Sequence, residues 1–137
     1  MTISVEKAGA DARAEVEGFY LCELRREVTL APEQQVFAAR ENGVVVGALR
    51  LCPEADTLLL RTVVVAEGLR GRGIGRVMLE AASAAIGARE CWCFPWEHLE
   101  GFYGRIGFRR TSRSDVPSLL EHRLAEGCIP TRREAAR

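Results

Sequence analysis

Apolar residues recur at every third or fourth position between residues 74 and 86, and this period of about 3.6 residues predicts an amphipathic helix. Gly87 follows the last apolar position and predicts the end of the helix, because glycine readily adopts the backbone conformation of a C-cap. The apolar stripe consists of Ile74, Val77, Met78, Ala81, Ala82, Ala85 and Ile86.

Shorter apolar or alternating segments predict strands. Asn42 and Gly43 separate two of them and predict a tight hairpin, because both residues tolerate positive φ. The segment 57–66 follows a turn at 53–56 and is largely apolar, which predicts a central strand. The expected strands are residues 2–7, 35–40, 44–51, 57–66, 90–94 and 108–111.

Three more helices are expected. Asp11 is the expected N-cap of the first, which carries Val16 and Tyr20 on its apolar face. Pro117 favours the last, because proline suits the first turn of a helix. These helices are expected at residues 11–28, 97–106 and 115–124.

The order of these elements predicts a mixed α+β fold, with a mostly antiparallel central sheet flanked by helices. The strand at 57–66, the helix at 74–86 and the strand at 90–94 imply one right-handed parallel crossover. At 137 residues, the chain is expected to form a single domain over residues 1–137. The polar, arginine-rich tail from about residue 130 is expected to fray.

The amino-acid composition limits the classes of partner that we expect the protein to bind. Nineteen Lys and Arg balance nineteen Asp and Glu, and a net charge of zero argues against nucleic-acid binding. The sequence has neither an apolar run of the ~20 residues that span a bilayer nor a signal peptide, so we expect no membrane partner and a cytoplasmic location. Five cysteines without a framework spacing are expected to be core residues, with no metal site.

A glycine-rich turn at residues 68–75 joins the central strand to the amphipathic helix. The first N–H groups of a helix have no partners within it, and the helix dipole places partial positive charge there. Gly71, Gly73 and Gly75 leave these groups accessible, while Arg70, Arg72 and Arg76 add full charges. A pyrophosphate group is therefore the expected ligand of the turn.

The spacing narrows the class of pyrophosphate ligand. The turn lacks the Gly-Lys-Ser/Thr of a nucleotide P-loop and the third glycine of a dinucleotide-binding fingerprint. Its Arg-x-x-Gly-x-Gly pattern, at Arg70, Gly73 and Gly75, resembles the acyl-CoA loop of the GCN5-related N-acetyltransferase (GNAT) superfamily. The segment 102–108, Phe-Tyr-Gly-Arg-Ile-Gly-Phe, matches a second motif of that family, and the element order fits from residue 2 to about 111.

The resemblance implies the GNAT fold and an N-acetyltransferase that transfers an acetyl group from acetyl-CoA to a primary amine of a small molecule. It implies that the backbone of the strand pairs with pantetheine and polarises the thioester, and that the strands part around Val65 and Cys91. It also implies that Tyr103 is the general acid toward the leaving thiolate. The implied cofactor-binding residues are Val63, Val64, Val65, Arg70, Gly71, Arg72, Gly73, Ile74, Gly75, Arg76 and Tyr103.

The general base is less well defined, because the strand segment 58–62 carries no carboxylate where many relatives have a glutamate. Arg61 stays protonated and cannot be a base. Glu97, His98 and a water chain are the candidates. The family's frequent asparagine is Trp96 here, which can line the substrate mouth instead.

Other interpretations remain open at this point. The missing carboxylate fits a non-catalytic acyl-CoA-binding or interaction module, and Cys91, Cys93 and His98 permit a redox or zinc module. Glu23, Glu27 and Glu33 are expected on a solvated face or, alternatively, near the amine. A homodimer is possible for such a chain, although no interface is indicated.

Overall fold

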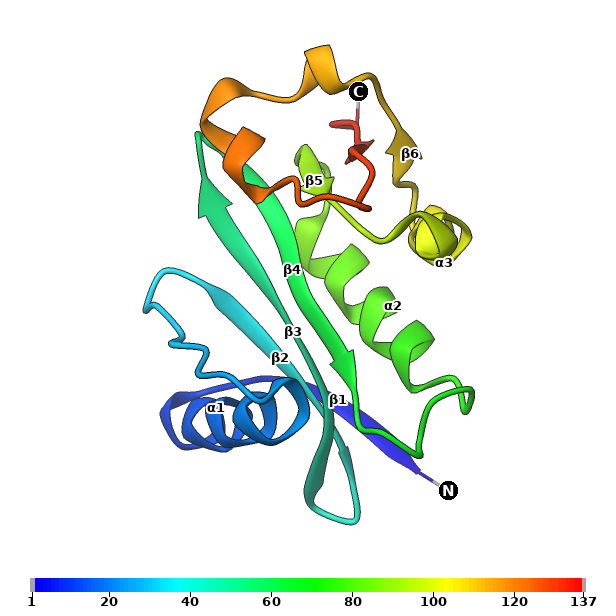
Figure 1. Ribbon diagram of the computed structural model, residues 1–137. Helices are drawn as coiled ribbons and strands as arrows, with labels where there is room; N and C mark the ends of the chain where they lie inside the picture. The colour runs from blue at the N-terminus through cyan, green and yellow to red at the C-terminus, as the bar shows by residue number, and fades with distance from the viewer. Residues whose placement is uncertain (1, 137) are drawn as a thin grey trace.

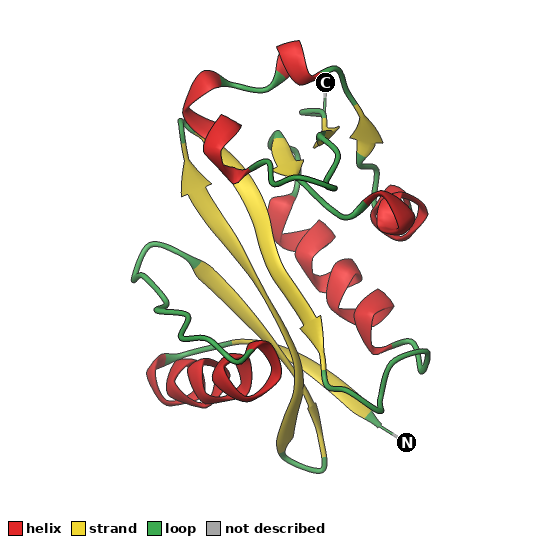
Figure 2. Cartoon of the chain, viewed as in Figure 1, coloured by secondary structure: helices red, strands yellow, loops and turns green. Residues whose placement is uncertain are grey.

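The computed structural model describes residues 2–136 and contains one seven-stranded sheet (Figures 1 and 2). The strand order is β1-β2-β3-β4-β5-β7-β6, and within the described residues only the β4–β5 pair is parallel. The mixed, mostly antiparallel sheet predicted from the sequence is therefore confirmed. The strands are β1 (Ile3–Lys7), β2 (Gln35–Glu41), β3 (Val44–Glu54), β4 (Thr57–Val65), β5 (Cys91–Cys93), β6 (Arg109–Arg110) and β7 (Thr131–Arg133).

Two helices cover opposite faces of the sheet. Alternation along β3 places Ala48 in the core under α1 (Ala10–Leu24), whereas Leu49 packs in the core under α2 (Ile74–Ile86). The shorter helical segments are η1 (Glu97–Leu99), α3 (Glu100–Gly104), η2 (Arg113–Asp115) and η3 (Ser118–Arg123). No helix within residues 2–136 is long and apolar enough to cross a membrane.

The strongest local patterns predicted the structure correctly. The helix at 74–86 is α2, with Gly87 at its C-cap, and the Asn42–Gly43 turn joins β2 to β3 with φ of 52° and 78°. The crossover from β4 through α2 to β5 is parallel, as expected.

The first helix is shorter than predicted. It begins after Gly9, so Asp11 lies in the first turn and does not cap the helix. It ends at Leu24 rather than near Val28, because Arg25 adopts the left-handed conformation with φ of 58°.

The C-terminal third departs most from the prediction. The helix expected at 115–124 is replaced by η2 and η3, which are two short 3-10 segments, and the helix expected at 97–106 is divided into η1 and α3. The tail is not frayed at Thr131–Arg133, because β7 pairs with both β5 and β6. The Thr131 hydroxyl also donates a hydrogen bond to the Cys93 carbonyl at 2.7 Å, which fixes this strand inside the sheet.

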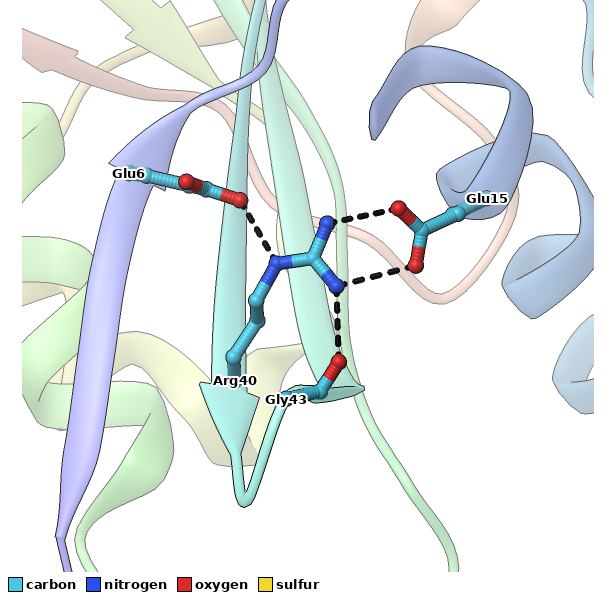
Figure 3. Close-up of polar contacts among 4 residues, drawn as sticks. All are labelled: Glu6, Glu15, Arg40 and Gly43. Carbon is cyan, nitrogen blue, oxygen red and sulfur yellow. Dashed lines mark hydrogen bonds and ion pairs between the residues drawn. The ribbon is translucent and has the colours of Figure 1, made fainter. Parts of the chain in front are cut away.

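A polar cluster fastens α1 to the edge of the sheet (Figure 3). The guanidinium of Arg40 donates to Glu6 of β1 at 2.6 Å, to both carboxylate oxygens of Glu15 of α1 and to the Gly43 carbonyl at 2.9 Å. One side chain of β2 thus links the neighbouring strand, the hairpin and the helix.

Candidate functional site

The site begins where β4 and β5 separate. These strands pair only at Leu59–Trp92 and Leu60–Cys93. Residues 61–65 of β4 have no partner on that side, so the gap opens beyond Cys93. Cys91 lies at the closed end, which corrects the expected position of the gap.

A bulge in β4 shapes the edge of this gap. The register with β3 shifts between Ala48 and Arg50, and Thr62 has φ of 56°, an unusual value for a β-branched residue. The hydroxyl of Tyr20 donates to the Thr62 carbonyl at 2.7 Å, and Arg50 Nε donates to Thr62 Oγ1 at 2.9 Å. Tyr20 is fully buried and Arg50 is 5% exposed, so two buried side chains hold the strained residue in place.

The bulge leaves backbone groups of β4 directed into the gap. Ala66 N–H donates to Val46 of β3 at 2.8 Å, and alternation along an antiparallel pair makes Val64 the next residue that bonds to β3. The backbone polar groups of Val63 and Val65 consequently face the side where β5 is absent. This strand edge is suited to the amides of an extended ligand, although the Val65 carbonyl also accepts a long hydrogen bond of 3.4 Å from Arg70 Nε.

The glycine-rich loop follows directly from this edge. Gly71 and Gly73 have φ of 81° and 83°, which glycine adopts without strain. Among residues 2–136, the amides of Gly73, Ile74, Gly75 and Arg76 donate to no acceptor, as expected at the start of α2. Four N–H groups without acceptors at a helix N-terminus have the chemistry that the anion-binding prediction requires.

The beginning of α2 lies close to α3. A Cβ at Gly75 would come within 2.9 Å of the Phe102 ring, so glycine permits this approach of the two helices. The contact places the loop opposite the aromatic segment of α3.

The first cavity, of about 620 Å³, lies between the loop, β4 and α3. It is lined by nine of the predicted residues, Val63, Val65, Arg70, Gly71, Gly73, Ile74, Gly75, Arg76 and Tyr103. The structure does not place Val64 or Arg72 in the lining, because Val64 packs toward α1 and Arg72 forms an ion pair with Glu41 at 3.3 Å. Sequence reasoning missed four lining residues, namely Leu69, Leu99, Phe102 and Arg105, of which only Leu99 lies outside the two motif segments 68–75 and 102–108.

The second cavity, of about 230 Å³, adjoins the same gap. Val63 and Tyr103 line both cavities, so the two spaces meet at these residues. The remaining lining of the second cavity consists of Arg26, Leu59, Leu60, Arg61, Thr62, Cys93, Phe94, Pro95 and Arg123. None of these was predicted as a binding residue, since they come from distant parts of the chain.

Tyr103 stands at the junction of the cavities and is 7% exposed. Its ring meets Phe102 and Phe108 edge-on, with centroids 5.0 and 6.4 Å away. Burial, with a smaller contribution from Cys93, raises the pKa of Tyr103 well above its ordinary value of about 10. The phenol therefore stays protonated at neutral pH and can donate a proton.

The structure does not bring the base candidates to this junction. Glu97 pairs with Arg110 at 3.2 Å and is 71% exposed, and neither Glu97 nor His98 lines either cavity. Trp96 also lines neither cavity and instead lies against Gly127. The linings of the two cavities contain no Asp, Glu or His side chain among residues 2–136.

Two further groups of candidates, the glutamates of the first helix region and the cysteines of β5, show no sign of a reactive role. Glu23 accepts the Glu67 N–H at 2.8 Å, and neither Glu27 nor Glu33 lines the two cavities. Burial raises the pKa of the Cys91 thiol to about 12 and that of Cys93 well above its usual range, so both thiols are protonated. Residues 2–136 contain no group of three His, Cys, Asp or Glu side chains arranged to hold a metal.

Comparison of the sequence with known proteins shows to which family the chain is similar. Residues 32–110 match the family model of the acetyltransferase (GNAT) domain. Over 76 residues, the chain is 28% identical to an uncharacterized N-acetyltransferase, YitI, of Bacillus subtilis; the match covers 53% of this chain and about half the length of that relative, 51%.

Solved structures agree in fold. An acetyltransferase of Corynebacterium glutamicum, described as histone acetyltransferase HPA2 and related acetyltransferase, has a TM-score of 0.75 at 15% identity, with 100% and 98% of the chains covered. The N-acetylglutamate synthase of Neisseria gonorrhoeae, solved with coenzyme A and L-arginine, has a TM-score of 0.72 at 13% identity, covering 98% of this chain and 34% of that one. With the loop, the gap and the fold in agreement, the chain belongs to the GNAT acetyltransferase domain family.

Proposed function

We propose that the protein is an N-acetyltransferase that transfers an acetyl group directly from acetyl-CoA to the primary amine of a small molecule. The observation that carries the proposal is the meeting of two cavities at Val63 and Tyr103. A direct transfer requires the thioester and the amine to approach one point from separate spaces, and this arrangement provides them.

The first cavity suits the acyl donor. The amides of residues 73–76, with Arg70 and Arg76, would hold the pyrophosphate, and the free edge of β4 would pair with the pantetheine arm. Its volume of about 620 Å³ falls within the range of ~300–1,000 Å³ typical of small-molecule sites.

The reaction needs a polarised thioester carbonyl, a proton for the leaving sulfur and an acceptor for the amine proton, and this chain would supply the first two. A backbone N–H of Val63 or Val65 polarises the thioester carbonyl, and the amine nitrogen forms the new C–N bond as the C–S bond breaks. Tyr103 donates its proton to the departing sulfur. The amine releases its proton to water in the open second cavity, because no carboxylate or imidazole lines it.

Acetyl-CoA binding and turnover test the proposal separately. A thermal shift should appear with acetyl-CoA, reaching about 2.7 kcal/mol of stabilisation at 100 times the dissociation constant. Release of free coenzyme A should depend on an added amine. The absence of any shift with acyl-CoA compounds would contradict the proposal at its first step.

The absence of a lining base favours a second candidate function, a non-catalytic acyl-CoA-binding module. It predicts the same thermal shift without amine-dependent release of coenzyme A. Mass spectrometry of an amine mixture after incubation with acetyl-CoA separates the two functions, since only the enzyme forms acetylated products.

A further inference from the structure

We propose that the acceptor is a small amine that also carries an anionic group, a carboxylate or a phosphate, which binds the arginines of the second cavity. This inference rests on the proposed function, because it identifies the second cavity as the acceptor site. It names a substrate class that the family membership leaves open.

The charges that line the second cavity are all positive. Arg26 follows α1, Arg61 lies on β4 before the bulge, and Arg123 ends η3. No Asp or Glu lines the cavity within residues 2–136. A substrate whose only charge is an ammonium would meet repulsion from all three guanidinium groups, whereas an anionic group would be attracted.

The protein leaves most of this charge uncompensated. Arg123 forms an ion pair with Glu54 at 3.0 Å, while the ion pairs of residues 2–136 include none with Arg26 or Arg61. Burial raises the pKa of the Cys52 thiol, which lies near Arg61, so this neighbour is neutral. Glu54, the partner of Arg123, also acts on Arg61 electrostatically, but Arg61 is a half-buried cation that forms no ion pair within residues 2–136.

A second cation lies behind the first. Burial, followed by the charges of Arg50 and Arg123, lowers the pKa of Arg61. Arg50 is itself buried, and its hydrogen bonds go to Thr62 and Gln34, which are uncharged. Partly desolvated cations in close proximity repel one another, and a bound anion removes that repulsion.

The position and size of the cavity restrict the acceptor further. Arg61 is two residues from Val63 along β4, and Val63 borders the junction with the donor cavity. The volume of about 230 Å³ lies below the range of ~300–1,000 Å³ of drug-sized sites, so the anion and the amine must belong to one compact molecule. Forked guanidinium donors match both carboxylate and phosphate oxygens.

Matched amine pairs test the inference. Alanine, β-alanine and glutamate would be compared with their amides, phosphoethanolamine with ethanolamine, and putrescine would serve as the dication, all with acetyl-CoA. We expect at least one acid or phosphate to have a kcat/KM at least tenfold higher than that of its counterpart without the anionic group. The α-amide is the less basic amine, so a preference for the acid does not arise from easier deprotonation.

Substitutions of the cavity arginines test whether the second cavity causes the preference for anionic amines. Arg61→Gln and Arg123→Gln should raise the KM for the anionic acceptor about tenfold or more and leave the KM for acetyl-CoA unchanged. Arg61→Lys should restore part of the loss. Arg113→Gln removes an exposed arginine outside both cavities and should change neither KM.

Calorimetry with the coenzyme A-saturated protein gives a readout that does not need turnover. Binding of an anionic amine that Arg61→Gln weakens supports the inference even if no acetyl transfer occurs, in which case only the proposed enzyme function fails. Equal or better use of amides, ethanolamine or putrescine overturns the inference while the proposed function stands. Absence of both turnover and calorimetric binding for every anionic amine also overturns it.

Discussion

The two cavities share Val63 and Tyr103 but are built in different ways. The first is lined by residues of two continuous segments, 63–76 and 99–105, and its proposed anion donors are the backbone amides of residues 73–76 together with arginines of the loop. The second is lined by residues from five separated parts of the chain, and its charge comes from arginine side chains alone. A backbone site suits a ligand common to a family, whereas a side-chain site can change its charge by substitution at single positions.

The largest effect is expected at the shared residue. Tyr103→Phe removes the proposed acid, so kcat should fall by about 10²–10⁴-fold while the affinity for acetyl-CoA stays within a factor of two or so. Steady-state kinetics and a binding titration on the same preparation measure both. An unchanged kcat would assign Tyr103 to packing alone.

The donor cavity should respond strongly to changes in its backbone. Gly73→Val places a β-branched residue at φ of 83° and should weaken acetyl-CoA binding by about ten- to a hundredfold, because the loop must leave its anion-binding conformation. Gly43→Val imposes similar strain at φ of 78° in the β2–β3 turn. Equal losses of acetyl-CoA affinity in the two variants would show that the loop conformation is not specific to the site.

The bulge between the cavities should connect their properties. Tyr20→Phe leaves the Thr62 carbonyl without its buried donor, which should cost about 1–3 kcal/mol of unfolding free energy. We expect KM to rise several-fold for both substrates, since Thr62 lines the second cavity and the adjacent Val63 lines both. Chemical denaturation with kinetics checks this, and a variant that loses stability with both KM values intact would separate the bulge from the site.

The pH dependence of stability should show that both tyrosines of the chain, Tyr20 and Tyr103, are buried. Burial raises the pKa of Tyr20 and of Tyr103, so the unfolded chain ionises first as the pH rises above about 10. Their stabilising effect is complete below that pH and declines above it, by about 1.4 kcal/mol per pH unit for each tyrosine. Urea unfolding between pH 8 and 11 should show a smaller decline in Tyr20→Phe than in the original protein, and an identical decline would contradict the buried state of this phenol.

The smallest effect is expected far from both cavities. Arg40→Met removes the links to Glu6 and Glu15 in Figure 3 and should lower the melting temperature by at most a few degrees, with a smaller difference at high salt. Kinetic constants for both substrates should not change. A loss of activity would mean that the α1 position reaches the site through this cluster.

The difference in how the two cavities are built also explains which parts of the structure the sequence could predict. Residues 63–76 form strand, loop and helix in one continuous segment, so local periodicity and the glycines were sufficient to predict these elements and to suggest an anion site between them. Arg26, Arg61 and Arg123 come together only through the fold, and nothing in their spacing indicates it. The tail was mispredicted for a related reason, because β7 is held by β5 and β6 and not by its own local preferences.

A crystal structure of the protein with coenzyme A would test the central claim most directly. The account predicts the pyrophosphate on the amides of residues 73–76 and the sulfur within about 3.5 Å of the Tyr103 hydroxyl, at the entrance to the second cavity. A coenzyme bound elsewhere, or a sulfur directed away from Tyr103, would contradict the account.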